Sequence, residues 1–277
     1  RDSTGLVSII TTAFADRGLN INQLDQFTND GSFFVRAVIE ASSGLFASPA
    51  AEDDEFRRLG ERLTASIDDA EVEIRPHPAQ QRIVVLASRT DHCLNEMIRR
   101  AQDGQLGGSI VKVVANHDVH RQLCEFHGIP FVVVPHEGLS KQEHEAAVLE
   151  AIGEDVDLIV LARYMRILSD EFLQKAPTQI INIHHSFLPS FIGANPYQRA
   201  HDRGVKMIGA TAHYVTADLD EGPIIEQDVT RVHHGHSKDD LVQAGADVER
   251  TVLHRAVQAH CEGRIFLNGD RTVVFGS

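Results

Sequence analysis

From residue 82 onward, short β-rich apolar runs alternate with segments whose apolar residues recur at helical spacing. The expected strands cover residues 82–87, 109–115, 130–134, 158–162 and 180–183, and the expected helices cover residues 93–102, 119–127, 142–152 and 169–174. This alternation favours a Rossmann-like α/β architecture, with a mostly parallel sheet covered on both faces. Ligands of such sheets bind at the carboxyl ends of the strands, so we look for a site at that edge.

Residues 1–78 follow a different pattern, and we expect them to form a separate unit. The predicted order is a helix over 6–15, strands over 21–28 and 32–41 joined by a turn at 29–31, a helix over 52–66 and a strand over 70–75. One more strand before Arg1 would complete a βαββαβ ferredoxin-like unit, so we expect upstream residues to be missing. The proline-bearing segment 76–81 predicts the boundary with a second domain over residues 82–277.

The segments 2–7 and 18–21 resemble the ACT domain, a small ligand-sensing module. In that interpretation Gly5 and Gly18 let a ligand approach the backbone, because glycine has no Cβ. The same two glycines also fit plain turn and helix C-cap positions. Both interpretations stay open at this point.

The richest chemistry lies between residues 180 and 227, which read as strand, turn, helix, strand, turn and strand. Asn182 and His184 end one strand, and Asp220 lies in the loop after the next. An amide, an imidazole and a carboxylate can polarise a carbonyl, stabilise an oxyanion and move protons. If the fold brings them together, they indicate acyl transfer or hydrolysis without a metal. Taken singly, each also fits a structural role: a strand-end cap, a satisfied polar histidine and a turn aspartate.

Three segments around these residues, 161–168, 182–189 and 209–225, closely resemble the folate-dependent formyltransferase superfamily over about residues 82–260. The resemblance implies that Asn182, His184 and Asp220 are catalytic. It also implies that folate binds two backbone segments and a histidine between them. The substrate-binding residues so predicted are Met165, Arg166, Ile167, Leu168, Thr216, Ala217, Asp218 and His213. For His213 a purely structural hydrogen bond is an equal alternative, and Arg166 could pair with the folate tail or reach solvent.

Within that superfamily the chain is most similar to the formyltetrahydrofolate deformylases. The loop 87–94 contains no glycine and carries Asp91, which disfavours the phosphate cradle of the ribonucleotide transformylases. The ACT-like front part matches the deformylase architecture. The implied reaction is hydrolysis of 10-formyltetrahydrofolate to tetrahydrofolate and formate, supplying formate for purine synthesis and balancing one-carbon pools. Phe187, Phe191 and Tyr197 could close the space of an amine acceptor, or simply pack in the core. The alternative is a formyltransferase acting on a small amine or ribonucleotide.

Charge and cysteine content restrict the partners and the compartment. The formal net charge of −14 argues against nucleic acid and anionic membranes, and no apolar run reaches the roughly 18 residues of a membrane helix. Cys93, Cys124 and Cys261 form no close pair, which is typical of reduced cytoplasmic thiols. We expect a folate substrate, no metal and no tightly bound cofactor. The resemblance further implies a homo-oligomer, dimer or tetramer, with glycine and methionine as effectors.

Two C-terminal features complete the reading. His233, His234 and His236 could suggest a metal, but a solvated helix entrance is favoured, because Ser237 and Asp240 fit a capping box for a helix from Lys238 to about residue 261. Residues 264–275 predict a hairpin that turns at Asn268 and Gly269.

Overall fold

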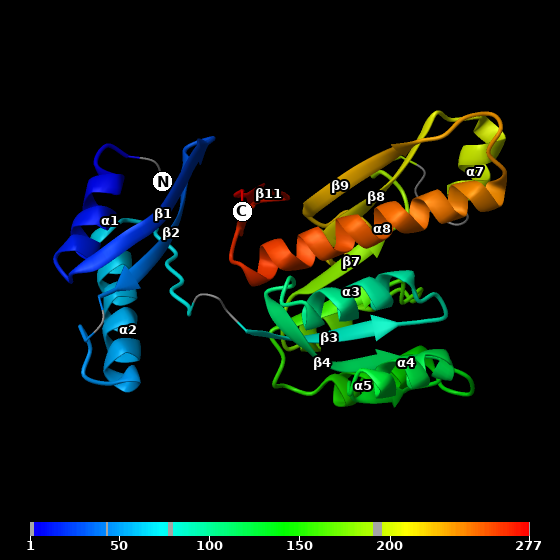
Figure 1. The fold of residues 1–277 in the computed structure, drawn as a ribbon, viewed down its shortest axis with the longest axis horizontal. Helices are drawn as coiled ribbons and strands as arrows, with labels where there is room; N and C mark the ends of the chain where they lie inside the picture. The colour runs from blue at the N-terminus through cyan, green and yellow to red at the C-terminus, as the bar shows by residue number, and fades with distance from the viewer. Residues whose placement is uncertain (1–2, 43, 77–79, 191–195, 277) are drawn as a thin grey trace. The chain divides into compact units, whose positions relative to one another are not determined.

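The structure is a computed structural model that describes residues 3–42, 44–76, 80–190 and 196–276. It contains two compact units, one of residues 1–79 with 275–277 and one of residues 80–274 (Figure 1). The predicted boundary at 76–81 includes residues 77–79, which lie outside the described residues. Phe191 also lies outside the described residues.

In the larger unit, the described residues form a seven-stranded sheet of order β5-β4-β3-β6-β7-β8-β9. The neighbours from β5 to β7 pair in parallel, whereas β8 and β9 are antiparallel. The predicted, mostly parallel α/β sheet is therefore confirmed. Its strands are β3 (Gln81–Ala87), β4 (Gly108–Ala115), β5 (Phe131–Val133), β6 (Leu158–Ala162), β7 (Ile180–His184), β8 (Met207–Tyr214) and β9 (Ile224–Arg231).

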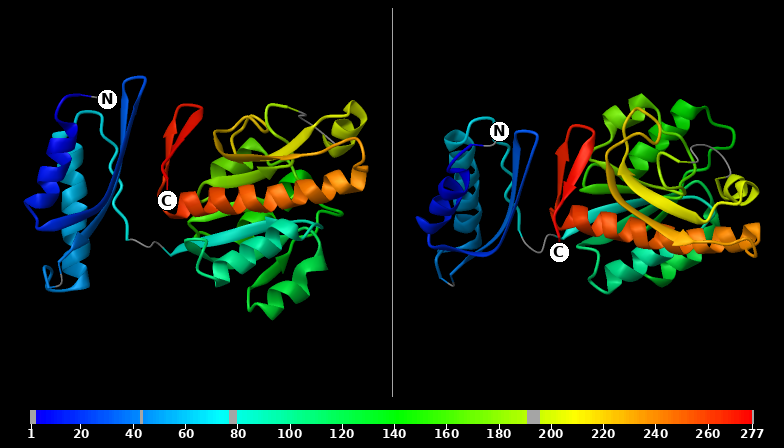
Figure 2. Two further views of the ribbon diagram at one scale, coloured as in Figure 1. Left: turned by 45° about the horizontal axis from the view of Figure 1, so that its top comes forward. Right: turned by 90° about the horizontal axis from the view of Figure 1, so that it is seen from above.

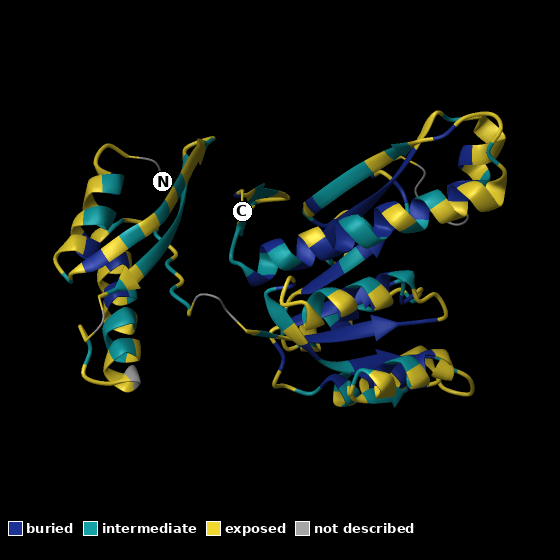
Figure 3. Ribbon diagram, in the orientation of Figure 1, coloured by how far each residue is buried: buried dark blue, intermediate teal, exposed yellow. Residues whose placement is uncertain are grey.

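Helices cover both faces of this sheet, as the buried strands require. Alternate residues of β3 pack into two different cores: Ile83 and Val85 meet α3 (His92–Gln102) and α8 (Lys238–Cys261), whereas Val84 and Leu86 meet α5 (Lys141–Ile152) and α6 (Asp170–Lys175). Helices α3 and α8 lie side by side in Figures 1 and 2, and β3 is buried along most of its length in Figure 3. The predicted helix 119–127 is a 3-10 turn, η1 (Asp118–His120), followed by α4 (Arg121–Phe126).

The strand order reverses in the middle of the sheet. From β3 the chain moves outward to β4 and β5, and it then returns to the other side of β3 as β6 and β7. The order therefore reverses between β3 and β6, and such a reversal opens a ligand crevice at the carboxyl ends of the strands. The segments that follow β3 and β6 thus lie where a ligand is expected.

The smaller unit contains α1 (Leu6–Ala15), the antiparallel pair β1 (Leu19–Asn29) and β2 (Ser32–Ala41), and α2 (Pro49–Ser66). This order fits the predicted ferredoxin-like unit. The strand expected over 70–75 is wrong, because that segment has no strand pairing in the described residues. Val72 and Ile74 nevertheless pack on the core around Leu59, so the alternation marks their inward face. In a βαββαβ unit the partner of this segment would be the first strand.

Two further details concern turns and caps. Gly5 and Gly18 both adopt positive φ, of 95° and 66°, as turn and cap glycines do. The C-terminal hairpin of β10 (Ile265–Asn268) and β11 (Arg271–Val274) turns at residues 269–270, one position later than predicted. Gly269 takes the first central position with φ 60°, which is where a type II′ turn needs glycine. Among the described residues, no helix combines the length and apolarity needed to cross a membrane.

Candidate active site

Four of the predicted site residues come together at the carboxyl end of β7. Asn182 and His184 are two positions apart on β7, so their side chains lie on the same face of the sheet. Asn182 pairs with His213 of the neighbouring β8, and Asp220 follows in the loop between β8 and β9. Residues 38 positions apart in sequence thereby form one cluster.

Hydrogen bonds define the geometry of this cluster. Asn182 Nδ2 lies 3.2 Å from His213 Nε2. His184 Nδ1 lies 3.3 Å from Asp220 Oδ1, and His213 Nε2 lies 3.8 Å from the same oxygen. The imidazole of His184 and the carboxylate of Asp220 are therefore in direct contact, and the amide of Asn182 is linked to the same carboxylate through His213.

The partners of His213 fix its tautomer. Its Nδ1 lies 2.9 Å from the carbonyl oxygen of Tyr214, which can only accept, so Nδ1 carries the proton. Nε2 is then the acceptor for the Asn182 amide. Burial lowers the pKa of His213, which keeps this ring neutral near pH 7. His213 thus orients Asn182 and leaves the second N–H of the amide available.

The two ring nitrogens of His184 differ in their surroundings, because Nδ1 contacts Asp220 and Nε2 does not. Its Nε2 is buried and has no hydrogen-bond partner in the described part of the chain. A buried polar atom without a partner costs on the order of 1–3 kcal/mol, so Nε2 is a candidate partner for a ligand atom. The hydrogen bond from His184 lowers the pKa of Asp220 although burial opposes this, so Asp220 is a carboxylate that can stabilise an imidazolium.

The backbone around the site is held in uncommon conformations. Asp220 has φ 59°, and Arg163 and Met165 after β6 have φ 58° and 60°. Each left-handed residue of this kind costs on the order of 1–3 kcal/mol and persists only where its surroundings enforce it. At Gly222 an added Cβ would overlap the Tyr214 carbonyl oxygen, so the loop that carries Asp220 can close only with glycine there.

The two segments predicted to bind folate border this cluster. After β6, Met165 and Ile167 are 62% and 63% exposed, unusual values for large apolar side chains. Asn116 donates to the carbonyl oxygen of the buried Tyr164 and fixes the start of the segment, while Leu168 packs against the core. Arg166 is half-buried, and Thr216, Ala217 and Asp218 form an exposed loop. Folate binding by these residues stays a prediction.

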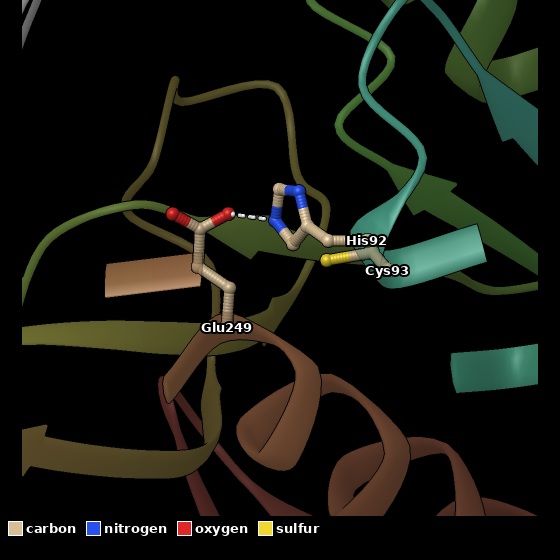
Figure 4. A group of neighbouring side chains, drawn as sticks. All are labelled: His92, Cys93 and Glu249. Carbon is tan, nitrogen blue, oxygen red and sulfur yellow. Dashed lines mark hydrogen bonds and ion pairs between the residues drawn. The ribbon is translucent and has the colours of Figure 1, made fainter. Parts of the chain in front are cut away.

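A second polar cluster, which the sequence reasoning missed, is built around Glu249 of α8. Glu249 is 1% exposed and accepts from the Tyr197 hydroxyl at 2.5 Å and from His92 Nε2 at 2.8 Å, while Arg163 Nε lies 3.5 Å away. Figure 4 shows the His92 contact. Burial alone would raise the pKa of Glu249, but His92, Arg163 and Tyr197 outweigh it, and the pKa is lowered. We call these four residues the Glu249 network.

The sequence contains one signal for this network. Glu249 lies within the apolar face of α8, three and four positions before Val252 and Leu253, where a solvated acid is not expected.

Two of the bulky residues that could close the space of an amine acceptor are described by the structure. Tyr197 of α7 (Pro196–Arg203) is buried, whereas Phe187 is 41% exposed.

Local contacts explain three further histidines, at positions 185, 233 and 236. His185 lies edge-on to the rings of both His184 and Tyr197, and burial, reinforced by Arg163, lowers its pKa to about 4. In the 233–236 turn, Nδ1 atoms of His233 and His236 accept backbone N–H groups. Ser237 and Asp240 form the predicted capping box, so the helix entrance is confirmed.

Comparison with known proteins agrees with this geometry. Residues 81–257 match the Formyl transferase family. The chain is 45% identical over 277 residues to a formyltetrahydrofolate deformylase of Mycobacterium tuberculosis, covering 99% of this chain and 88% of the relative. Its fold resembles the crystal structure of a formyltetrahydrofolate deformylase from Burkholderia mallei, with TM-score 0.87, 40% identity, and coverage of 99% and 96% of the two chains. A glycinamide ribonucleotide transformylase from Symbiobacterium toebii aligns with TM-score 0.68 and 29% identity, covering 76% of this chain and all of that one.

Proposed function

The chain belongs to the formyltetrahydrofolate deformylases of the formyl transferase family, and we propose that it hydrolyses 10-formyltetrahydrofolate to tetrahydrofolate and formate. One observation carries this proposal: His184 contacts the ionised carboxylate of Asp220 through Nδ1, keeps a buried Nε2 without a partner in the described residues, and shares a strand face with the oriented amide of Asn182. These groups match the charges that develop during attack on a formyl carbon.

The proposed reaction is a direct attack by water. Water adds to the formyl carbon, the bond from that carbon to N10 breaks, N10 takes a proton, and the formyl group leaves as formate. The free N–H of Asn182 and a protonated His184 Nε2 stabilise the negative oxygen of the intermediate, each by about 10²- to 10³-fold in rate. Asp220 accepts the proton of the attacking water, directly or through a second water.

We propose that the pterin of the substrate lies between the 165–168 segment and the 216–218 loop. Exposed backbone and apolar side chains at these positions support this placement. The half-buried Arg166 is the cation available to the glutamate tail from the first of these segments.

The direct test is formate release from 10-formyltetrahydrofolate in amine-free buffer. We expect stoichiometric formate and tetrahydrofolate from the intact chain and loss of turnover in His184→Ala, with folate binding retained. If formate or a formyl product appeared only after an amine was added, the chain would be a formyltransferase instead.

We also propose that the reaction needs neither a metal nor a tightly bound cofactor, since Asn182, His184 and Asp220 provide the required donors and acceptor. Dialysis against EDTA should leave the rate of formate release unchanged. A rate that fell and returned only with an added divalent cation would contradict this.

For residues 1–78 we propose an ACT-like regulatory unit that binds glycine or methionine and joins copies of the chain into a dimer or tetramer. Its helix and strand order and its own core around Leu59 support a separately folded module. Calorimetric titration with each amino acid tests effector binding, and light scattering tests assembly. If neither amino acid released or absorbed heat on titration, the effector proposal would be wrong. We propose that the protein lies in the cytoplasm, where its three buried cysteines stay reduced and its formate supplies purine synthesis.

A further inference from the structure

The Glu249 network lies in the crevice where the strand order reverses. His92 follows the carboxyl end of β3, and Arg163 follows the carboxyl end of β6. These two strands flank the reversal. His92 Nε2 lies 2.8 Å and Arg163 Nε lies 3.5 Å from the same carboxylate oxygen of Glu249. The crevice that an open α/β sheet normally offers to a ligand is here occupied by the side chains of the chain itself.

The network is largely buried and contacts the reaction centre through His185. The side chains of His92, Arg163 and Glu249 are 12%, 14% and 2% exposed, and Tyr197 is 8% exposed as a residue. His185 bridges the two clusters, because its ring contacts the His184 ring at a centroid distance of 5.2 Å and the Tyr197 ring at 6.1 Å. Any reactant approaching His184 from the network side would meet these side chains.

The contacts of the network are typical of a hydrogen-bonded cluster that fills space and not of a metal site. His92, Cys93 and Glu249 place a nitrogen, a sulfur and an oxygen within 4.8 Å of one another (Figure 4). However, the Arg163 guanidinium stands beside the same carboxylate and would repel a cation. Burial and Glu249 raise the pKa of the Cys93 thiol well above its usual range, which disfavours the thiolate that metals bind.

The position of Tyr197 depends on a glycine in the facing helix. A Cβ added at Gly245 of α8 would overlap the Tyr197 hydroxyl, so only a bare backbone lets that hydroxyl reach Glu249 one helical turn further on. Glycine in a helix interior costs about 0.5–1 kcal/mol relative to alanine. The contact between the phenol and the carboxylate is therefore built into two elements rather than incidental.

We propose that the Glu249 network determines acceptor specificity: it fills the space through which an amine would reach the formyl carbon and so confines attack to water. This inference rests on the proposed hydrolysis. A relative with the same sheet, at 29% identity, is named for transfer to glycinamide ribonucleotide, an acceptor that needs room beside the formyl group. In this chain Tyr197 and His92 occupy the reversal crevice, while water needs almost no space.

The test is the partition of the formyl group between water and an added amine. Glycinamide is the probe, and formate and formylglycinamide are quantified together in the wild type, Tyr197→Ala and the matched control Tyr197→Phe. In transfer, the amine nitrogen replaces N10 on the formyl carbon and gives N10 its proton. We expect Tyr197→Ala to raise the ratio of formylglycinamide to formate by on the order of tenfold or more, because pocket contacts discriminate acceptors on this scale. Tyr197→Phe keeps the ring and should keep the wild-type ratio.

Two results would overturn the inference. One is a Tyr197→Ala protein that releases formate with an unchanged product ratio, and the other is a wild type that already formylates glycinamide. Should Tyr197→Ala fail to fold, His92→Ala opens the other side of the crevice and is judged by the same ratio. Failure of the wild type to release formate would instead refute the proposed hydrolysis, so the two failures are distinguishable.

Discussion

Replacing Glu249 with alanine would remove the acceptor shared by Tyr197, His92 and Arg163. The Arg163 side chain is 14% exposed, and its Nε has no hydrogen-bond partner in the described residues, so the guanidinium would lose its ion pair in a largely buried position. Removing one partner of a buried ion pair costs about 3–5 kcal/mol. For a unit of this size, that loss lowers Tm by about 6–20 °C.

The measurement is thermal and urea unfolding followed by two probes, because the two units of the chain need not unfold together. Glu249→Gln is the matched control, because it keeps the shape and an acceptor oxygen but not the charge. Its free energy of unfolding should fall by less than that of Glu249→Ala. Tyr197→Phe removes one hydrogen bond to a charged group and should cost about 1.5–3 kcal/mol. If the free energy of unfolding of Glu249→Ala were within about 1 kcal/mol of the wild-type value, the reasoning that the network is buried and ionised would be refuted.

Three further outcomes follow from the reaction centre. Asp220→Ala should lower kcat by on the order of 10²- to 10⁴-fold with folate binding retained, and a fully active variant in steady-state assays would remove this carboxylate from the mechanism. The stabilisation that ionised Asp220 gives is present above its unfolded pKa and is lost as pH falls through its lowered folded pKa, so the difference in unfolding free energy between wild type and Asp220→Asn should shrink from pH 7 toward acid. A difference that grew toward acid would contradict the sign of the shift. Gly222→Ala should reduce formate release more than it reduces Tm, because the added Cβ displaces the Asp220 loop from the Tyr214 carbonyl oxygen, and kinetics beside calorimetry would show whether the two effects separate in this way.

The sequence predicts the architecture and the placement of Asn182 and His184 for physical reasons. Hydrophobic periodicity predicts the sheet and its helices, and the spacing of two residues on one strand predicts that Asn182 and His184 share a face at the carboxyl edge. Their proximity to Asp220 was implied only by the family resemblance. The strand over 70–75 was overpredicted, because alternation reports which side chains face inward and not whether a neighbouring strand exists. The hairpin turn was misplaced by one residue because either register of the 268–270 segment puts a turn-forming residue at the bend.

The Glu249 network could not be predicted in the same way. His92 and Glu249 are 157 positions apart, and nothing local in either helix specifies that they meet. An acid in a helix is ordinarily assigned to solvent, and only the apolar neighbours of Glu249 argue otherwise. Long-range pairing of buried polar groups is set by the packing of α3 against α8, which follows from the whole core and not from a motif.

Gly245 has a practical consequence for anyone who engineers this chain to resist heat. Exchanging mid-helix glycines for alanine is a standard stabilising substitution, since it restricts the unfolded chain and favours the helical state. At this position the extra methyl group would collide with the Tyr197 hydroxyl oxygen, so the substitution should destabilise the folded protein and not stabilise it. A screen that ranks substitutions by helix propensity alone would choose it, and the resulting protein should melt earlier than its parent.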